Sequence, residues 1–267
     1  MAIKLVAIDL DDTLLDPDLQ ISSHCLEVIR RVQNKGVLVT LATGRMYSSA
    51  LPYARLLQVD VPLITYQGAL VKNSLSGEVL YNKPVPFAEA VEVMDFFHQA
   101  GVHYHCYFDD RLCMERLTKD GKDYSELAGV EPVLIENLRE EAKTRETLKI
   151  LSVVHDKELI MKLQGGLAAR YSPRHLNITR SKPYYLEVMH PRATKGDALR
   201  VVADHYGIAR DQVMALGDSY NDLAMIEWAG LGVAMGNARD EVKQAAAYVT
   251  HSNEEEGVAE ALYKFVL

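Results

Sequence analysis

The chain has 267 residues, of which 48% are hydrophobic and 25% are charged, and its formal net charge is −8. This composition is typical of a globular protein with one large domain or two moderate ones, and the acidic balance argues against a nucleic-acid partner, which would call for a basic patch. No stretch approaches the roughly 18 consecutive apolar residues of a membrane helix, so no membrane partner is expected.

The cysteines and the first residues indicate the compartment. Cys25, Cys106 and Cys113 are too few and too irregularly spaced for a disulfide framework. The opening "MAIKLVAID" reaches an aspartate too early to be the core of a signal peptide. We therefore expect a reduced, cytoplasmic protein, and nothing in the sequence indicates its oligomeric state.

Strands and helices are expected to alternate in the first part of the chain. The run "KLVAID" (residues 4–9) is short and continuously apolar, as buried parallel strands are. A helix is predicted over residues 22–36, followed by a strand at 37–44, a helix near 46–57 and a strand at 62–68. This alternation predicts a parallel sheet with right-handed crossovers.

The pattern changes after a predicted β-hairpin that turns at Ser76 and Gly77. Residues 84–191 mix helices near 87–100 and after 156 with the predicted strands "VHYHCYF", "LCMER", "LKILSVV", "LNITRS" and "YYLEVMH". This order is typical of a separate α+β domain with an antiparallel sheet.

The first pattern returns with the predicted helix "KGDALRVVADHYG" and the strands "QVMALGD", "GLGVAM" and "AYVT". We therefore expect an α/β protein with a Rossmann-like parallel-sheet core, formed by residues 1–83 and 192–267, and an inserted α+β domain, residues 84–191.

Three predicted core strands end in polar residues. The residues at these ends are Asp9 and Asp11 after the first strand, Thr43 and Gly44 after the second, and Asp218, Asn221 and Asp222 after "VMALG". Each strand end alone is also explained by turn and cap residues. Ligands of doubly wound sheets bind beyond the carboxyl ends of the strands, so if these strands are neighbours, their ends form one site.

The residue types at this site suit phosphoryl transfer. A carboxylate can attack phosphorus and form an aspartyl-phosphate, and Asp9 is our candidate nucleophile. Asp11 lies close enough in sequence to protonate the leaving oxygen and then to deprotonate the attacking water. Lys195, at a predicted helix start, would supply positive charge. The Thr43 hydroxyl and the Gly44 amide would bind phosphoryl oxygens.

The charge at this site requires a cation. Mg²⁺ prefers oxygen ligands in octahedral geometry and keeps several waters. A site made of Asp9, the Asp11 main-chain carbonyl and Asp218 suits it.

These four pieces resemble the motifs of the haloacid dehalogenase superfamily. "DLDDT" matches its first motif, "ATG" its second, Lys195 its third and "GDSYND" its fourth. The long insertion, with "TGR" after the second strand, is similar to that of the Cof-type branch, especially the YidA-like sugar-phosphate phosphatases. The stretches "ITYQGAL", "YYLEVMHPRATKG", "AMIEWAGLGVAMGNA" and "GVAEAL" extend the resemblance over essentially the whole chain.

The resemblance implies a role for each matching residue. Asp9 would be the nucleophile and a metal ligand, Asp11 the acid/base and a second ligand, and Asp218 a further metal ligand. The residues that would contact phosphate are Leu10 through its amide, Thr43, Gly44, Lys195 and Asn221. Asp222 would be a supporting carboxylate that orients Lys195 or a metal-bound water. Many relatives have glycine where this chain has Asp12, so Asp12 is expected to point away from the metal and has no assigned role.

The inserted domain contains the cluster "VHYHCYFDDRLC", whose spacing fits no compact zinc pattern. His103 and His105 are two apart on a predicted strand, so both rings lie on one face. The cluster is explained by a half-buried strand with one polar side, followed by a turn at Asp109 and Asp110. The alternative is that His103, His105 and Tyr107 face a substrate under a closing cap.

The sequence therefore predicts a Mg²⁺-dependent phosphatase of small phosphorylated metabolites, with sugar phosphates first. A phosphosugar mutase that uses the same aspartyl-phosphate chemistry is the first alternative, and a non-catalytic sensor of phosphorylated ligands is the second. A dinucleotide-dependent oxidoreductase is disfavoured because Asp-Leu-Asp-Asp stands where its glycine-rich turn should be.

Overall fold

The computed structural model describes residues 2–267, which form two compact units. Unit 1 contains the residues up to Gly44, together with Ala50–Tyr81 and Thr194–Leu267; unit 2 contains Arg45–Ser49 and Asn82–Ala193. The chain thus leaves unit 1 after Tyr81 and returns at Thr194. The grouping of Arg45–Ser49 with unit 2 was not indicated by the sequence.

Unit 1 is centred on a parallel five-stranded sheet with the order β14-β13-β12-β1-β2. Its strands are β1 (Leu5–Ile8), β2 (Leu38–Leu41), β12 (Val213–Gly217), β13 (Leu231–Ala234) and β14 (Tyr248–Val249). The residues of β1 and β12 are buried along their whole length, which explains their continuous apolar sequences. The parallel sheet predicted from the strand–helix alternation is confirmed.

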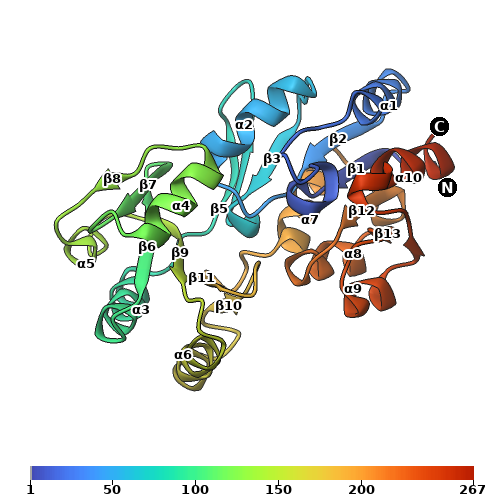
Figure 1. Ribbon diagram of the computed structural model, residues 1–267. Helices are drawn as coiled ribbons and strands as arrows, with labels where there is room; N and C mark the ends of the chain where they lie inside the picture. Colours follow the sequence, from blue (N-terminus) through green and yellow to red (C-terminus); the bar gives the residue numbers. More distant parts are fainter. Residues whose placement is uncertain (1) are drawn as a thin grey trace. The chain divides into compact units, whose positions relative to one another are not determined.

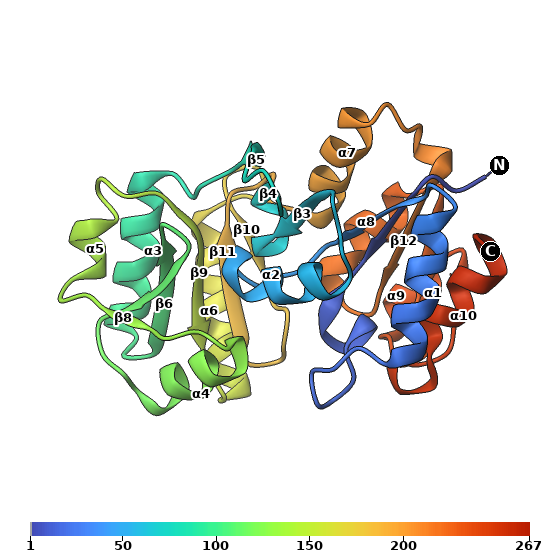
Figure 2. The same ribbon diagram turned by 90° about the horizontal axis from the view of Figure 1, so that it is seen from above.

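Helices cover both faces of this sheet. They are α1 (Ser23–Asn34), α7 (Lys195–His205), α8 (Leu223–Trp228), α9 (Asp240–Ala245) and α10 (Gly257–Phe265), which Figure 1 labels. A further helix, α2 (Tyr47–Leu56), has its first residues in unit 2 and the rest in unit 1. Figure 2 shows α1 and α10 on one side of the sheet and α7 and α8 on the other. Leu5 and Ala7 of β1 belong to the apolar cluster that contains Leu199 of α7 and Met225 of α8.

The third predicted strand does not belong to the parallel sheet. β3 (Pro62–Thr65) pairs antiparallel with β4 (Leu70–Asn73), and β5 (Val79–Asn82) completes a separate three-stranded sheet. β3 joins the parallel arrangement only through an isolated bridge between Ala42 and Ile64. The hairpin predicted between β4 and β5 is present.

Unit 2 is built on a six-stranded sheet with the order β10-β11-β9-β6-β7-β8, antiparallel except for the β7–β8 pair. Its strands are β6 (His103–Phe108), β7 (Arg111–Met114), β8 (Val133–Leu134), β9 (Thr147–Val153), β10 (Asn177–Thr179) and β11 (Tyr185–Met189). Its helices are α3 (Phe87–Gln99), α4 (Lys119–Ala128), α5 (Leu138–Glu141) and α6 (Lys157–Arg170). The predicted antiparallel sheet is therefore present, whereas the two-residue strand β8 was not predicted.

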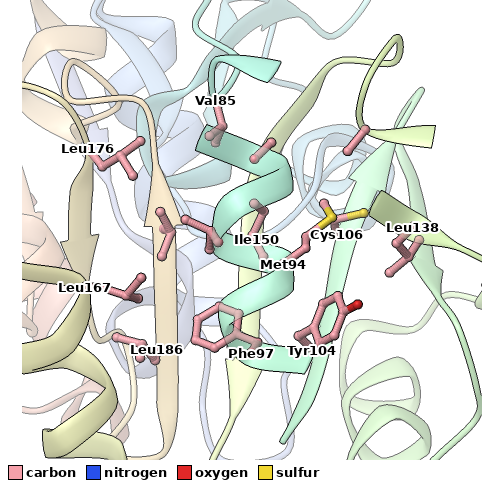
Figure 3. Close-up of a cluster of buried hydrophobic side chains, with 14 of the residues drawn as sticks. Val85, Met94, Phe97, Tyr104, Cys106, Leu138, Ile150, Leu167, Leu176 and Leu186 are labelled. Atoms are coloured by element: carbon pink, nitrogen blue, oxygen red, sulfur yellow. The ribbon is translucent and has the colours of Figure 1, made fainter. Parts of the chain in front are cut away.

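The two faces of this sheet differ in chemistry. On one face, Met94 and Phe97 of α3 pack against Tyr104, Cys106 and Ile150, as Figure 3 shows. Leu163 and Leu167 of α6 belong to the same cluster. The alternate residues of β6 are polar and lie on the opposite face with α4.

The polar face of β6 is held by hydrogen bonds. His103 Nε2 lies 3.1 Å from His105 Nδ1, and the hydroxyls of Tyr107 and Tyr124 are 2.5 Å apart. The sequence predicted a half-buried strand with one polar side; the polar side is present, but Tyr104–Phe108 are buried, so its polar groups are buried as well. Within residues 2–267, no helix has both the length and the apolar character needed to cross a membrane.

Candidate active site

The strands that carry the predicted site residues are neighbours. β1 pairs with β12 on one side and with β2 on the other, and all three are parallel. Their carboxyl ends therefore meet at one edge of the sheet, which is where ligands of such sheets bind.

Asp9 directly follows β1, and a tight turn then changes the direction of the chain. Asp9 is extended and 5% exposed, and its amide donates to the Leu216 carbonyl at 3.0 Å. Leu10–Leu14 form a single π-type turn in which the Leu15 amide donates to the Leu10 carbonyl at 2.9 Å. Asp12 in this turn has a φ of 62°, in the left-handed region. Asp11, with φ −72° and ψ 127°, is extended like Asp9, and the change of chain direction occurs at Asp12.

Lys195 is the first residue of α7 and is completely buried. Its Nζ donates to Asp9 Oδ1 at 2.5 Å and to Asp222 Oδ1 at 2.6 Å. α7 reaches this position by close packing on α8, since a Cβ on Gly196 would lie 2.4 Å from the Ala224 carbonyl oxygen. The structure therefore brings Lys195 between two of the predicted carboxylates.

Asp222 connects Lys195 to the loop that follows β12. Its Oδ2 accepts hydrogen bonds from the amides of Asp218 and Ser219, both at 3.0 Å. The other oxygen, Oδ1, accepts from Lys195. Both carboxylate oxygens of Asp222 are thus used to hold the lysine and the loop.

Negative charge exceeds positive charge at this site. Asp9, Asp218 and Asp222 each offer an oxygen within 4.8 Å of the others, and Lys195 forms ion pairs with Asp9 and Asp222. Burial, followed by repulsion from Asp222, raises the pKa of Asp9 well above its usual range, although Lys195 opposes the shift. Burial and the same neighbour raise the pKa of Asp218 to about 7.

The donor set fits a hard divalent cation. Carboxylate oxygens are the ligands that Mg²⁺ and Ca²⁺ take in proteins, and such a cation would offset the excess charge. Asp218 Oδ1 also accepts from the Thr13 hydroxyl at 3.1 Å, which fixes its orientation. Among residues 2–267, Asp9, Asp218 and Asp222 are the one group of His, Cys, Asp and Glu side chains gathered closely enough to hold a metal. Asp11, the remaining predicted ligand, lies in the adjoining turn.

The end of β2 meets the end of β3 through Gln67. The Thr43 carbonyl accepts from the Gln67 amide at 3.1 Å, and Gln67 Oε1 accepts from Asn221 Nδ2 at 2.8 Å. A Cβ on Gly44 would lie 2.4 Å from Gln67 Nε2, so only glycine fits there without displacing that side chain. Asn221 Oδ1 is buried and has no hydrogen-bond partner within the described residues.

Gln67 and Thr13 are site residues that the sequence reasoning missed. Tyr66 and Gln67 have φ values of 52° and 59°, and two consecutive non-glycine residues in the left-handed region are a recognised sign of a functional site. This signal belongs to the backbone conformation and has no sequence pattern of its own. Thr13, by contrast, lies inside the stretch "DLDDT" that identified the first motif.

Asp9, a buried carboxylate, thus lies beside a buried lysine and within an acidic cluster. The family model of the haloacid dehalogenase-like hydrolases matches residues 6–262. The chain belongs to this family. Its relatives are named phosphatases, so the phosphatase class predicted from the sequence is confirmed.

Two curated relatives and one solved structure match nearly full-length. The 5-amino-6-(5-phospho-D-ribitylamino)uracil phosphatase YcsE of Bacillus subtilis is 32% identical, with 99% of this chain and 96% of that protein covered. The pyridoxal phosphate phosphatase YbhA of Escherichia coli is 27% identical, with both chains fully covered. The structure of the HAD subclass IIB sugar phosphatase BT4131 matches with a TM-score of 0.82 and 27% identity over 98% of each chain. The α/β fold predicted from the sequence is thereby confirmed.

Proposed function

We propose that this family member is a Mg²⁺-dependent phosphatase that hydrolyses small phosphorylated metabolites through an aspartyl-phosphate on Asp9. The observation that carries the proposal is the buried Lys195 ammonium, which lies 2.5 Å from Asp9 Oδ1 in a cluster with excess negative charge. Such a site favours an anionic nucleophile that must approach a phosphate dianion.

The proposed reaction has two steps. An Asp9 carboxylate oxygen attacks phosphorus, the bond from phosphorus to the ester oxygen breaks, and Asp11 gives its proton to the departing oxygen. Water then attacks the phosphorus of the aspartyl-phosphate, Asp11 takes a proton from that water, and phosphate and the Asp9 carboxylate are released. Lys195 stabilises the negative charge that builds up on the transferred group.

The remaining residues hold the phosphoryl group and the cation. Asp9 and Asp218 would bind Mg²⁺ with the Asp11 carbonyl, and the bound ion would neutralise charge between the nucleophile and the phosphoryl oxygens. The Leu10 amide, Thr43, Gly44 and Asn221 would contact the phosphoryl oxygens. The buried Asn221 Oδ1, which lacks a partner in the described residues, supports a polar ligand beside it.

Sugar and other polyol phosphates are the proposed substrate class. The matching structure is that of a sugar phosphatase, and YcsE is named for a substrate with a phosphorylated ribityl chain. YbhA is named for pyridoxal phosphate, so this likeness includes an aromatic substrate as well. A panel of substrates is therefore needed to decide among the classes.

The inserted segment, residues 84–191, is proposed to act as a cap that sets specificity while unit 1 performs the chemistry. A cap that excludes bulk water would strengthen the electrostatic interactions and admit one positioned water. The polar face of the unit 2 sheet supports this division, because it carries buried hydrogen-bonding groups that the apolar packing on α3 and α6 does not need.

A phosphate-release assay over a panel of phosphomonoesters, with and without Mg²⁺, tests the proposal. We expect release that requires the metal and falls by about 10³-fold or more in Asp9→Asn. Asp16→Asn is the matched control, because Asp16 accepts the amides of Asp18 and Gln20 at a nearby turn and lies outside the site. Beryllium fluoride should form an adduct on Asp9.

Two results would contradict the proposal. Equal rates of phosphate release in the wild type and Asp9→Asn would show that Asp9 is not the nucleophile. Formation of an isomer of the substrate without phosphate release would indicate a mutase instead.

A further inference from the structure

Two asparagine side chains from distant parts of the chain hold the turn that carries Asp11, one at its middle and one at its C-terminal end. Asn237 Nδ2 donates to the Asp12 carbonyl at 2.7 Å, and Asn253 Nδ2 donates to the Leu15 carbonyl at 2.9 Å. The two asparagines are also joined, since the Asn253 amide donates to Asn237 Oδ1 at 3.1 Å. We call Asn237 and Asn253 the amide clasp.

This turn needs outside support because its backbone is unfavourable. Asp12 has a φ of 62°, in the left-handed region, which residues other than glycine adopt less readily. Within the turn, the amide of Leu15 donates to the carbonyl of Leu10. The Asp12 carbonyl receives its side-chain hydrogen bond from Asn237, which therefore favours the conformation that Asp12 disfavours.

The clasp also connects the Asp11 turn to the other predicted metal ligands. Asn237 belongs to the loop after β13, where the Met235 amide donates to the Gly217 carbonyl at 3.0 Å and the Arg239 amide donates to the Asp218 carbonyl at 3.2 Å. The Thr13 hydroxyl, in the same turn as Asp11, also donates directly to Asp218 Oδ1. A shift of Asn237 would therefore change the spacing between Asp11 and the loop of Asp218.

We propose that Asn237, supported by Asn253, is a positioning residue that holds the Asp11 turn where Asp11 can protonate the leaving oxygen. This inference depends on the proposed function, because it takes Asp11 as the acid. Neither asparagine is assigned to contact the substrate. The effect of the clasp should therefore depend on how strongly the leaving group needs a proton.

Two variants of Asn237 test whether its hydrogen bond to the Asp12 carbonyl, and not an added charge or a lost contact with Asn253, causes the effect. Asn237→Asp keeps the oxygen that accepts from the Asn253 amide but loses the donor to Asp12. Asn237→Ala loses both contacts without adding charge. Asn73→Asp is the matched control, since Asn73 caps the hairpin turn through its side-chain oxygen, which aspartate retains, and lies outside the site.

The test compares a sugar phosphate, whose alkoxide leaves poorly, with p-nitrophenyl phosphate, whose phenolate leaves without a proton. Because a positioned general acid is worth about 10²–10⁴-fold, we expect both Asn237 variants to lose about 10-fold or more in kcat/KM on the sugar phosphate. This ratio reports the step in which the leaving group departs and excludes the later attack of water, which both substrates share. The loss on p-nitrophenyl phosphate should stay below about 3-fold, and Asn73→Asp should match the wild type on both.

Hydrogen–deuterium exchange of the metal-free protein gives a readout independent of activity. Amides in residues 10–15 should exchange faster in both Asn237 variants, whereas those of β12 should not change.

Equal losses on the two substrates, or discrimination in Asn237→Asp alone, would overturn the positioning role, as would unchanged exchange. A wild-type protein that releases no phosphate would overturn the proposed function instead, and the exchange experiment would still decide whether the clasp holds the turn.

Discussion

The two units bury charged groups in opposite ways. In unit 1, Lys195 lies between Asp9 and Asp222 with Asp218 beside them, so carboxylates outnumber the lysine. In unit 2, Lys149 Nζ lies 3.0 Å from Glu187 Oε1, and these two side chains, 2% and 1% exposed, carry equal and opposite charge.

This difference separates a site that requires a further cation from one that is already balanced. A buried pair recovers its desolvation cost only if partners neutralise and hydrogen-bond each charge. The Lys149–Glu187 pair meets that condition. The unit 1 cluster does not meet it unless a proton or a cation is added, and the raised pKa of Asp9 expresses the same imbalance.

Removal of Lys195 should have the largest effect. In Lys195→Met, the charge of the buried carboxylates loses its opposing ammonium, and we expect phosphate release to fall by about 10³-fold. The free energy of unfolding should fall by about 3–5 kcal/mol at neutral pH, as when one partner of a buried ion pair is removed. Steady-state kinetics and urea denaturation measure the two effects.

Lys149→Met is the matched control, because it also removes a buried lysine from a carboxylate. It should lower stability by a similar amount while Mg²⁺-dependent release from p-nitrophenyl phosphate persists. If both variants lost activity equally, the distinction between an unbalanced and a balanced site would be wrong.

Replacing both members of the Lys149–Glu187 pair tests whether their charges balance each other. Lys149→Met alone leaves Glu187 without its ammonium, at a cost of about 3–5 kcal/mol, whereas Lys149→Met with Glu187→Leu should return to within about 1 kcal/mol of the wild type. Urea denaturation of both variants tests this difference.

The sequence predicted best what local patterns encode. β1 and β12 are buried on both faces, so their apolar runs identified them, and the ends of these strands led to Asp9 and Asp222. Lys195, which contacts both carboxylates, was predicted from its place at a helix start. The sequence did not predict that β3 belongs to a second sheet, because its apolar sequence is that of any buried strand. The turn that follows β3 determines its antiparallel pairing with β4.

Gln67 and Asn237 were missed for a different physical reason. Gln67 reaches the predicted site residue Asn221 across 154 residues of sequence, and Asn237 reaches Asp12 across 225. Asparagine and glutamine are common in loops, and no periodicity marks the ones that hydrogen-bond to distant backbone. Such contacts form only when distant segments of the chain come together, whereas the predicted catalytic carboxylates stand just after apolar strands in the sequence.

The hydrogen-bonded histidines of unit 2 give the smallest predicted effect. Thr118 Oγ1 accepts from the Gly121 amide at 3.1 Å and lies 2.8 Å from His103 Nδ1, and His103 Nε2 lies 3.1 Å from His105 Nδ1. A neutral His103 with its proton on Nε2 satisfies both contacts, because it accepts from the Thr118 hydroxyl and donates to His105. The pair is therefore held in its neutral form.

Protonation of His103 should weaken unit 2 at low pH. Burial lowers the pKa of His103 to about 4, with Asp120 opposing the shift and Arg116 adding to it. Because the pKa is lower in the folded than in the unfolded state, the unfolded state binds the proton first. The resulting stability is present above pH ~6.5 and is lost as the pH falls towards 4, by up to about 3 kcal/mol.

Urea denaturation of the wild type and His103→Asn between pH 7 and 4.5, combined with hydrogen exchange in β6, measures this term. Other carboxylates titrate in both proteins, so only the difference between the two curves reports His103. The wild type should lose stability more steeply than His103→Asn below pH 6.5. Parallel curves would mean that the neutral histidine pair adds no pH-dependent stability, and that unit 2, like unit 1, owes its response to acid to its carboxylates.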